Sequence, residues 1–384
     1  MMLAASSLLR ALLWLFAFTP GALLAQTREP PPALAARAWV LIDHESGQLL
    51  AAQNPDMKVE PASLTKIMTS YLGYAALREG RLRRNQVVPV SEKAWKAIGS
   101  RMFIEPNKPV TVDELLHGIV VQSGNDASIA LAEAIAGSEE AFVALMNAEA
   151  KRLGMNGTHF ANATGLPDPQ HYTTARDLAR LTTALIRDFP EDYKTYALKD
   201  YTYNKIKQPN RNRLLWLDER IDGVKTGHTE TAGFCLIASR FDGTRRLTAV
   251  VLGTASEQAR AQETLALLHY GFRAFEAVKL YDKEQSLTRL KVFKGAQGTL
   301  AAGFTVPLVL SLPKGVAAQP ERLKVEVLSR QPLIAPVRRG EAVARLRLSV
   351  DGEPWGEYPL VALADVPLAG FFGRAWDGFK LFFQ

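Results

Sequence analysis

The sequence predicts an α+β protein, in which a mixed domain around a central sheet is followed by a small all-β domain. Three observations support this architecture. An apolar run at residues 38–43 precedes helical periodicity from about 61 to 188, two apolar runs follow within residues 222–253, and the periodicity changes to two residues after about 278. With 384 residues, the chain has room for two or three domains. Its composition, 47% hydrophobic and 22% charged, is that of a folded globular protein.

Residues 1–25 have the pattern of a secretory signal peptide. Arg10 is their only charge, an apolar stretch runs to about Phe18, and small residues lead to a cleavage site after Ala25. An uncleaved anchor helix is the alternative. Residues 26–37 contain several prolines and alanines and are predicted to be a linker. We therefore expect an exported protein.

The mixed domain is predicted to span residues 38–277. Residues 38–43 should form a buried strand. Two later strands, around Cys235–Ser239 and Leu247–Leu252, should form a hairpin across the turn at Asp242–Gly243. A helix from about Glu257 to Ala277 should end the domain, since its apolar residues recur on one face.

Residues 278–365 are predicted to form the all-β domain. Leu346, Leu348 and Val350 alternate with polar residues, and Asp351–Gly352 then marks a hairpin turn. No cluster of chemically reactive groups occurs in this part of the sequence, so we assign it no catalytic role.

Residues 366–384 are predicted to form an amphipathic helix. Aromatic residues recur at near-helical spacing from Phe371 to Phe383, whereas Arg374, Asp377 and Lys380 lie on the other face. The segment is too short and too charged to span a bilayer, but it could lie in the headgroup plane of a membrane surface. The alternative is a helix that docks on its own domain.

Charge and composition narrow the possible partners and cofactors. The excess of 46 Lys and Arg over 39 Asp and Glu suits an anionic surface, and it is too dispersed to predict nucleic-acid binding. The single cysteine, Cys235, lies in an apolar run and is expected to be buried. The six histidines are scattered without metal-ligand spacing, so we expect no metal or other cofactor.

The first chemical motif is Ser63-Leu64-Thr65-Lys66. An apolar helical face begins at Leu64, so Ser63 should lie at or near a helix start, with Lys66 three residues on and within reach of it. A hydroxyl beside an amine is a nucleophile with a candidate base. The alternative is an N-cap serine with a solvated lysine.

Two further motifs are each a weak indication of function when taken alone. Ser123-Gly124-Asn125 should form a tight turn between two helices, the first of which begins with a capping box of Thr111 and Glu114. Lys225-Thr226-Gly227-His228 should lie on an edge strand, where Gly227 would let a ligand backbone approach closely. An ordinary turn and an ordinary strand are the alternatives.

In this order, the three motifs resemble the S-x-x-K, S-D-N and K-T-G signature of penicillin-binding proteins and class A β-lactamases, with Ser-Gly-Asn in second place. The chain is similar to low-molecular-mass penicillin-binding proteins that are D-alanyl-D-alanine carboxypeptidases, in the branch with a C-terminal β domain and an amphipathic anchor. The resemblance implies a serine β-lactamase/transpeptidase-like domain with a central antiparallel sheet. It also implies a periplasmic protein on the outer face of the inner membrane, with peptidoglycan stem peptides and β-lactams as ligands.

The chemistry of the motifs suggests roles for six residues, and the resemblance adds the oxyanion hole and Arg260. Ser63 would attack the carbonyl between two D-alanines, with Lys66 as base, kept neutral by the nearby charge of Lys225. Ser123 would relay a proton to the leaving amine, and Asn125 would bind the substrate amide or hold Lys66. The backbone N–H groups of Ser63 and His228, the residue after Gly227, would form the oxyanion hole. The substrate carboxylate would be bound by Lys225, Thr226 and Arg260.

Three other functions are alternatives: two enzymes that would use the same catalytic residues, and a binding protein that would need none of them. A class A β-lactamase needs an added glutamate to activate water, and the loop at Gly165–Asp168 carries an aspartate instead. A DD-endopeptidase would use the same machinery on crosslinked peptides. A catalytically idle wall-binding protein would not need Ser63, Lys66, Ser123 and Lys225.

Overall fold

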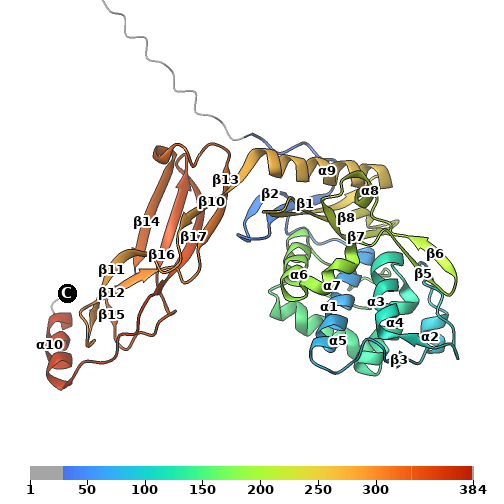
Figure 1. The fold of residues 1–384 in the computed structure, drawn as a ribbon, viewed down its shortest axis with the longest axis horizontal. Helices are drawn as coiled ribbons and strands as arrows, with labels where there is room; N and C mark the ends of the chain where they lie inside the picture. The colour runs from blue at the N-terminus through green and yellow to red at the C-terminus, as the bar shows by residue number, and fades with distance from the viewer. Residues whose placement is uncertain (1–28, 330, 383–384) are drawn as a thin grey trace, which may run out of the picture. The chain divides into compact units, whose positions relative to one another are not determined.

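A five-stranded antiparallel sheet forms the centre of the mixed domain (Figure 1). The computed structural model describes residues 29–329 and 331–382, and the predicted signal peptide lies outside them. The strand order is β2-β1-β9-β8-β7. The strands are β1 (Ala38–Asp43), β2 (Leu49–Gln53), β7 (Ile221–Thr229), β8 (Gly233–Phe241) and β9 (Arg246–Thr254). The predicted strands are confirmed, and β7 is an edge strand, as expected.

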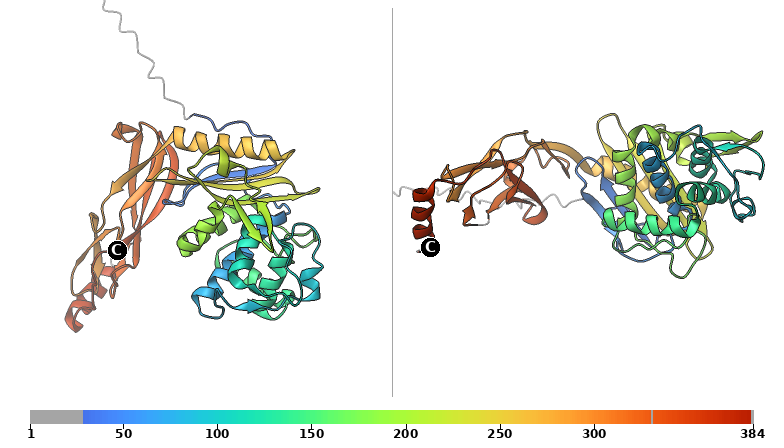
Figure 2. Two further views of the ribbon diagram at one scale, coloured as in Figure 1. Left: turned by 45° about the vertical axis from the view of Figure 1, so that its right-hand side comes forward. Right: turned by 90° about the horizontal axis from the view of Figure 1, so that it is seen from below.

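Helices cover both faces of this sheet, which explains why every residue of β1 is buried. Val40 and Ile42 point into one core, shared with α1 (Lys66–Arg78) and α6 (Ala175–Asp188). The alternate residues, Trp39 and Leu41, point into a second core beneath α9 (Glu257–Ala274). The views in Figures 1 and 2 accordingly place α9 on the opposite face of the sheet from α1 and α6. Burial on two faces favours a continuous apolar run.

Shorter elements complete the mixed domain, and one of them, α8 (Leu214–Leu217), packs into the core beneath α9. The capping box at Thr111 and Glu114 is confirmed, because each side chain accepts a hydrogen bond from the backbone of the other. The remaining elements are η1 (Ala62–Thr65), β3 (Val87–Val88), α2 (Glu92–Trp95), β4 (Val110–Thr111), α3 (Val112–His117), η2 (Gly118–Gln122), α4 (Asn125–Ala136), α5 (Glu139–Arg152), α7 (Pro190–Tyr193), η3 (Lys194–Ala197), β5 (Asp200–Tyr203) and β6 (Ile206–Pro209).

The helix α9 ends at Ala274, three residues earlier than its apolar pattern predicts. Phe275 has extended backbone and begins β10 (Phe275–Tyr281), which pairs with β13 (Leu308–Pro313). Its buried ring packs edge-on against Tyr270. Strand pairing and burial of this aromatic ring therefore override the local helical pattern.

The C-terminal β domain pairs β10 and β13 as one sheet and has a second sheet in the order β14-β16-β17-β12-β11-β15. Leu346, Leu348 and Val350 are buried and Arg345 and Arg347 are exposed, so the predicted alternation is confirmed. The elements are β11 (Ser286–Phe293), β12 (Thr299–Gly303), η4 (Pro320–Arg322), β14 (Leu323–Ser329), β15 (Leu333–Ile334), β16 (Ala342–Val350) and β17 (Glu353–Ala362).

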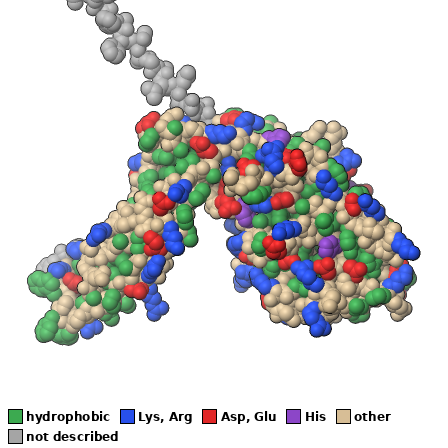
Figure 3. All heavy atoms as spheres, viewed as in Figure 1, with side chains coloured by type: hydrophobic (Ala, Val, Ile, Leu, Met, Phe, Trp, Pro, Cys, Tyr) green, Lys and Arg blue, Asp and Glu red, His purple; other side chains and the backbone are tan. Residues whose placement is uncertain are grey.

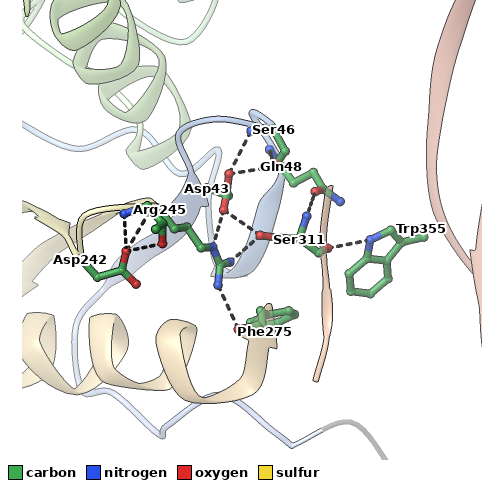
Figure 4. Close-up of polar contacts among 9 residues, drawn as sticks. Asp43, Ser46, Gln48, Asp242, Arg245, Phe275, Ser311 and Trp355 are labelled. Carbon is green, nitrogen blue, oxygen red and sulfur yellow. Dashed lines mark hydrogen bonds and ion pairs between the residues drawn. The ribbon is translucent and has the colours of Figure 1, made fainter. Parts of the chain in front are cut away.

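A buried polar cluster joins the end of β1 to the β domain (Figure 4). Arg245 Nε donates to Asp43 Oδ2 at 2.7 Å, and Arg245 Nη1 donates to the Phe275 carbonyl at 3.0 Å. Ser311 of β13 donates its hydroxyl to Asp43 at 2.7 Å and accepts from Arg245 and, at its carbonyl, from Trp355 Nε1. Burial alone would raise the pKa of Asp43, but hydrogen bonds from the Ser46 backbone N–H, Arg245 and Ser311, together with the charge of Arg245, outweigh burial and lower it. A buried ion pair is tolerated when its remaining polar atoms are bonded in this way.

The last described element is the predicted helix, α10 (Phe371–Phe382). Its aromatic residues are exposed, whereas Asp377 accepts a hydrogen bond from the Lys294 backbone N–H at 2.7 Å. Within residues 29–329 and 331–382, the helices all lack the length and apolarity needed to cross a membrane.

Candidate active site

Ser63 and Lys66 meet where η1 passes into α1. Lys66 is fully buried at the first position of α1, and its Nζ lies 3.0 Å from Ser63 Oγ. The same Nζ donates to Asn125 Oδ1 at 2.7 Å and to the Thr164 carbonyl at 2.6 Å. The predicted pairing of hydroxyl and amine is therefore present, and two further oxygens face the amine.

The two further oxygens determine what a neutral Lys66 can do. A carbonyl oxygen and an amide oxygen only accept hydrogen bonds. Asn125 presents its oxygen to Lys66 because its Nδ2 donates to the Ile98 carbonyl at 2.6 Å. A neutral amine has two N–H donors and one lone pair. Once Asn125 and Thr164 hold both donors, the lone pair is left to face Ser63 Oγ.

Burial supplies the neutral form of this amine. The pKa of Lys66 is lowered to about 7 mainly by burial, the charge of Arg211 adds to this shift, and Asp126 opposes it. The sequence also predicted a lowered pKa for Lys66, but with the charge of Lys225 as its cause. Lys225 is itself buried, and burial and then the charge of Lys66 hold its pKa well below the usual value. Lys225 is thus protonated to a smaller extent than a lysine in water.

The turn Ser123-Gly124-Asn125 brings α4 to the nucleophile. Ser123 has φ 61°, a left-handed conformation that is uncommon for a residue other than glycine. The turn is held by the Asn125 N–H, which donates to the Ser100 carbonyl at 2.7 Å, and by Asp126, whose buried carboxylate accepts from the N–H groups of Met102 and Phe103. Ser123 Oγ is buried without a hydrogen-bond partner among the described residues.

The edge strand β7 packs directly against the nucleophile turn. A Cβ on Gly227 would lie 3.0 Å from the Pro61 carbonyl and 3.2 Å from Leu64 Cγ. We expected Gly227 to allow close approach of a ligand, but in the structure it allows β7 to pack closely against Pro61 and Leu64. The His228 ring is exposed and packs at a tilt of 30° against Phe234, with ring centres 4.0 Å apart.

A pocket of about 410 Å³ opens over these elements. Six of the predicted residues line it, namely Ser63, Ser123, Thr226, Gly227, His228 and Arg260. Lys66, Asn125 and Lys225 lie buried behind its wall. The other lining residues were not predicted from the sequence; they are Gly99, Ser100, Arg211, Phe234 and Glu257.

Two cations and one carboxylate set the charge of the pocket. Arg260 is almost fully buried, and its Nη2 donates to Glu257 Oε1 at 2.8 Å while its Nη1 points to the Gly227 carbonyl at 3.4 Å. Arg211 supplies the second guanidinium. The pocket is therefore suited to an anionic ligand beside the serine.

Comparison with known proteins agrees with this geometry. Residues 25–256 match the family model described as D-alanyl-D-alanine carboxypeptidase, and residues 275–368 match the penicillin-binding protein 5 C-terminal domain. The chain is 42% identical to D-alanyl-D-alanine carboxypeptidase DacC of Escherichia coli over 97% of its own length and 95% of that protein. The chain belongs to the D-alanyl-D-alanine carboxypeptidase family. It is a serine-type carboxypeptidase and a penicillin-binding hydrolase.

Solved structures of penicillin-binding proteins support the fold. Penicillin-binding protein 5 of Haemophilus influenzae superposes with a TM-score of 0.82 at 38% identity, over 88% of this chain and 99% of that one. Penicillin-binding protein D2 of Listeria monocytogenes, determined in an ampicillin-bound form, superposes with a TM-score of 0.59 at 30% identity, over 64% of this chain and all of that one. The predicted fold class, family and activity are confirmed.

Proposed function

We propose that Ser63 is the nucleophile of this carboxypeptidase and that neutral Lys66 is its base. The observation that supports this proposal is the arrangement of oxygens around Lys66 Nζ, which leaves the lone pair of a neutral amine toward Ser63 Oγ. A base with a pKa near 7 combines a useful neutral fraction with proton affinity at neutral pH.

We propose the following acylation step. Lys66 takes the hydroxyl proton as Ser63 Oγ attacks the carbonyl carbon of the penultimate D-alanine. The N–H groups of Ser63 and His228 stabilise the oxyanion. The C–N bond then breaks, and the proton passes from Lys66 through Ser123 to the leaving amine of the terminal D-alanine. Water hydrolyses the serine ester and releases the shortened stem peptide. A β-lactam would acylate Ser63 in the same way, but its leaving nitrogen would stay attached.

We propose that Thr226 and Arg260 bind the terminal carboxylate, with Arg211 as a further cation. Both arginines line the pocket with Thr226 and Ser63. Lys225 contributes less charge than the sequence suggested, since its Nζ is buried and donates to the Thr226 carbonyl at 3.3 Å. It instead supports β7 from behind the pocket.

The loop around Thr164 argues against efficient β-lactam hydrolysis. Asp168 is exposed and accepts from the Gln170 N–H, and Glu139 is tied to the Ala163 N–H and to Lys93. Neither carboxylate lines the pocket. We therefore expect the β-lactam adduct to persist.

We also propose that the mature enzyme is exported and lies on the outer face of the inner membrane, bound there by α10. Hydrophobic side chains gather on this helix (Figure 3), and Phe372, Trp376 and Phe382 are between 61% and 86% exposed. Asp377 meanwhile contacts the β domain through Lys294. An exposed aromatic face beside Arg374 and Lys380 suits an anionic lipid surface. The proposed division is 38–277 for the catalytic domain, 278–365 for the β domain and 366–384 for the anchor, although β10 begins three residues before the first boundary.

Release of D-alanine tests the central proposal. The mature protein and Ser63→Ala would each be incubated with a pentapeptide that ends in D-Ala-D-Ala, and free D-alanine would be measured. We expect release by the first protein alone. Release by a folded Ser63→Ala protein at the same rate would exclude Ser63 as the nucleophile.

A further inference from the structure

A closed loop brings the Thr164 carbonyl to Lys66. At its base, His159 and Tyr172 pair through both backbone groups, at 2.8 and 3.0 Å. Thr173 pairs in the same way with Val59, four residues before Ser63. Residues 160–171 therefore form a loop whose two ends lie together beside the nucleophile turn.

Four contacts hold this loop on the nucleophile turn and α1. The Thr164 carbonyl accepts from Lys66, and the Ala163 carbonyl accepts from Thr69 Oγ1 at 2.7 Å. Gly165 lies so close that a Cβ would be 1.8 Å from the Ala62 carbonyl oxygen. The fourth contact joins Thr65 Oγ1 to His171 Nε2 at 2.8 Å.

The fourth contact is made by a buried histidine that the reaction does not use. His171 is 2% exposed, and the edge of its ring packs against Phe160. Its Nδ1 accepts from the Ala161 N–H at 3.3 Å, so Nε2 carries the proton and donates to Thr65 Oγ1. The pKa of His171 is lowered to about 4, mainly by burial; Asp168 opposes this shift, and His159 and Lys66 add to it. His171 is therefore a neutral, fixed donor at neutral pH.

We infer that His171 is a positioning residue, which fastens the returning arm of the loop to Thr65 and thereby keeps the Thr164 carbonyl on Lys66. The inference rests on the proposed role of Lys66 as base. Thr65 lies between Ser63 and Lys66 in sequence, so the bond joins the loop directly to the turn that carries both groups. If the loop withdraws, one N–H of Lys66 loses its acceptor and the lone pair is no longer directed at Ser63. Misplacement of a catalytic group by about 1 Å can cost about 100-fold in rate.

The test compares His171→Ala, His171→Gln and Thr65→Val in the otherwise intact protein. Penicillin binding and acylation would be followed by stopped flow, so that the dissociation constant of the first complex and the first-order acylation constant are separated. We expect His171→Ala and Thr65→Val to lower the acylation constant about 10- to 100-fold with little change in the dissociation constant. The double variant should be no slower than either single variant, because both remove the same bond.

Two controls separate positioning from stability. Glutamine can donate from Nε2 and accept at Oε1, so His171→Gln should recover most of the acylation constant. His159→Ala removes the other histidine of the loop, whose Nδ1 bonds to the Gln170 carbonyl at 2.7 Å, and it should acylate normally. Melting temperatures would show that each variant is folded.

Two results would overturn the inference. One is a normal acylation constant in folded His171→Ala or Thr65→Val; the other is an equal loss in His159→Ala. The variant Lys66→Ala separates a failure of the inference about His171 from a failure of the proposed role of Lys66 as base. If Lys66→Ala is inactive and His171→Ala is normal, only the inference about His171 fails.

Discussion

Replacement of Asn125 by aspartate would place a carboxylate where an amide oxygen now lies, 2.7 Å from Lys66 Nζ. The carboxylate stabilises the ammonium form, and an opposite charge at this distance raises a pKa by about 1–3 units. Lys66 acts as base only when it is neutral, so acylation rises with pH through this pKa. In the unmodified enzyme the midpoint should lie near pH 7.

The size of the effect follows from the neutral fraction. With a pKa of about 7, about half of Lys66 is neutral at pH 7, and a rise of about 1–3 units leaves about 10% to 0.1% neutral. Acylation of Asn125→Asp at pH 7 should therefore fall about 5- to 500-fold and recover at higher pH. The assay is acylation by a fluorescent penicillin, measured from pH 5.5 to 10.

Asn125→Ala is the matched control, because both variants lose the hydrogen bond from Asn125 Nδ2 to the Ile98 carbonyl. The alanine variant should be slower at every pH without an upward shift of the midpoint. If the midpoint of Asn125→Asp does not move, or if acylation by the unmodified enzyme is independent of pH between 6 and 9, the reasoning about Lys66 is refuted.

Three further predictions concern other parts of the molecule. Gly227→Ala should lower the free energy of unfolding by about 1–3 kcal/mol and slow acylation, because its Cβ would crowd Pro61 and Leu64. Urea titration would measure the first effect and penicillin labelling the second. An unchanged midpoint of urea unfolding would contradict the packing argument. Arg245→Ala should cost about 3–5 kcal/mol, since it leaves the buried carboxylate of Asp43 unpaired; unchanged thermal unfolding would count against it. Deletion of residues 367–384 should release the mature protein from membranes with its activity intact, and retention on membranes would disprove the anchor.

Much of the site could be predicted because its side chains follow short-range rules. The spacing of Ser63 and Lys66 at a helix start already brings hydroxyl and amine together, and the order of the three motifs indicates the family. The early strand and the late hairpin follow from apolar runs bounded by turns. These patterns depend only on neighbours in sequence, and they can therefore be recognised in a single sequence. The structure confirms them.

The remainder depends on tertiary contacts that a single sequence does not reveal. The Thr164 carbonyl belongs to the backbone, so no side-chain pattern marks it. The lowered pKa of Lys66 was predicted, but its main cause is burial, which depends on how the loop and α4 close over the amine. The end of α9 at Ala274 is similarly decided by pairing of β10 with the β domain.

The most direct test of the base is covalent labelling of Lys66→Ala by penicillin, with the modified residue identified by peptide mass spectrometry. The unmodified protein should be labelled on Ser63. The lysine variant, shown to be folded by cooperative thermal unfolding, should lose about 1,000-fold or more in labelling rate, as expected when a nucleophile loses its activating group. Labelling of Ser63 in Lys66→Ala at close to the unmodified rate would contradict the account.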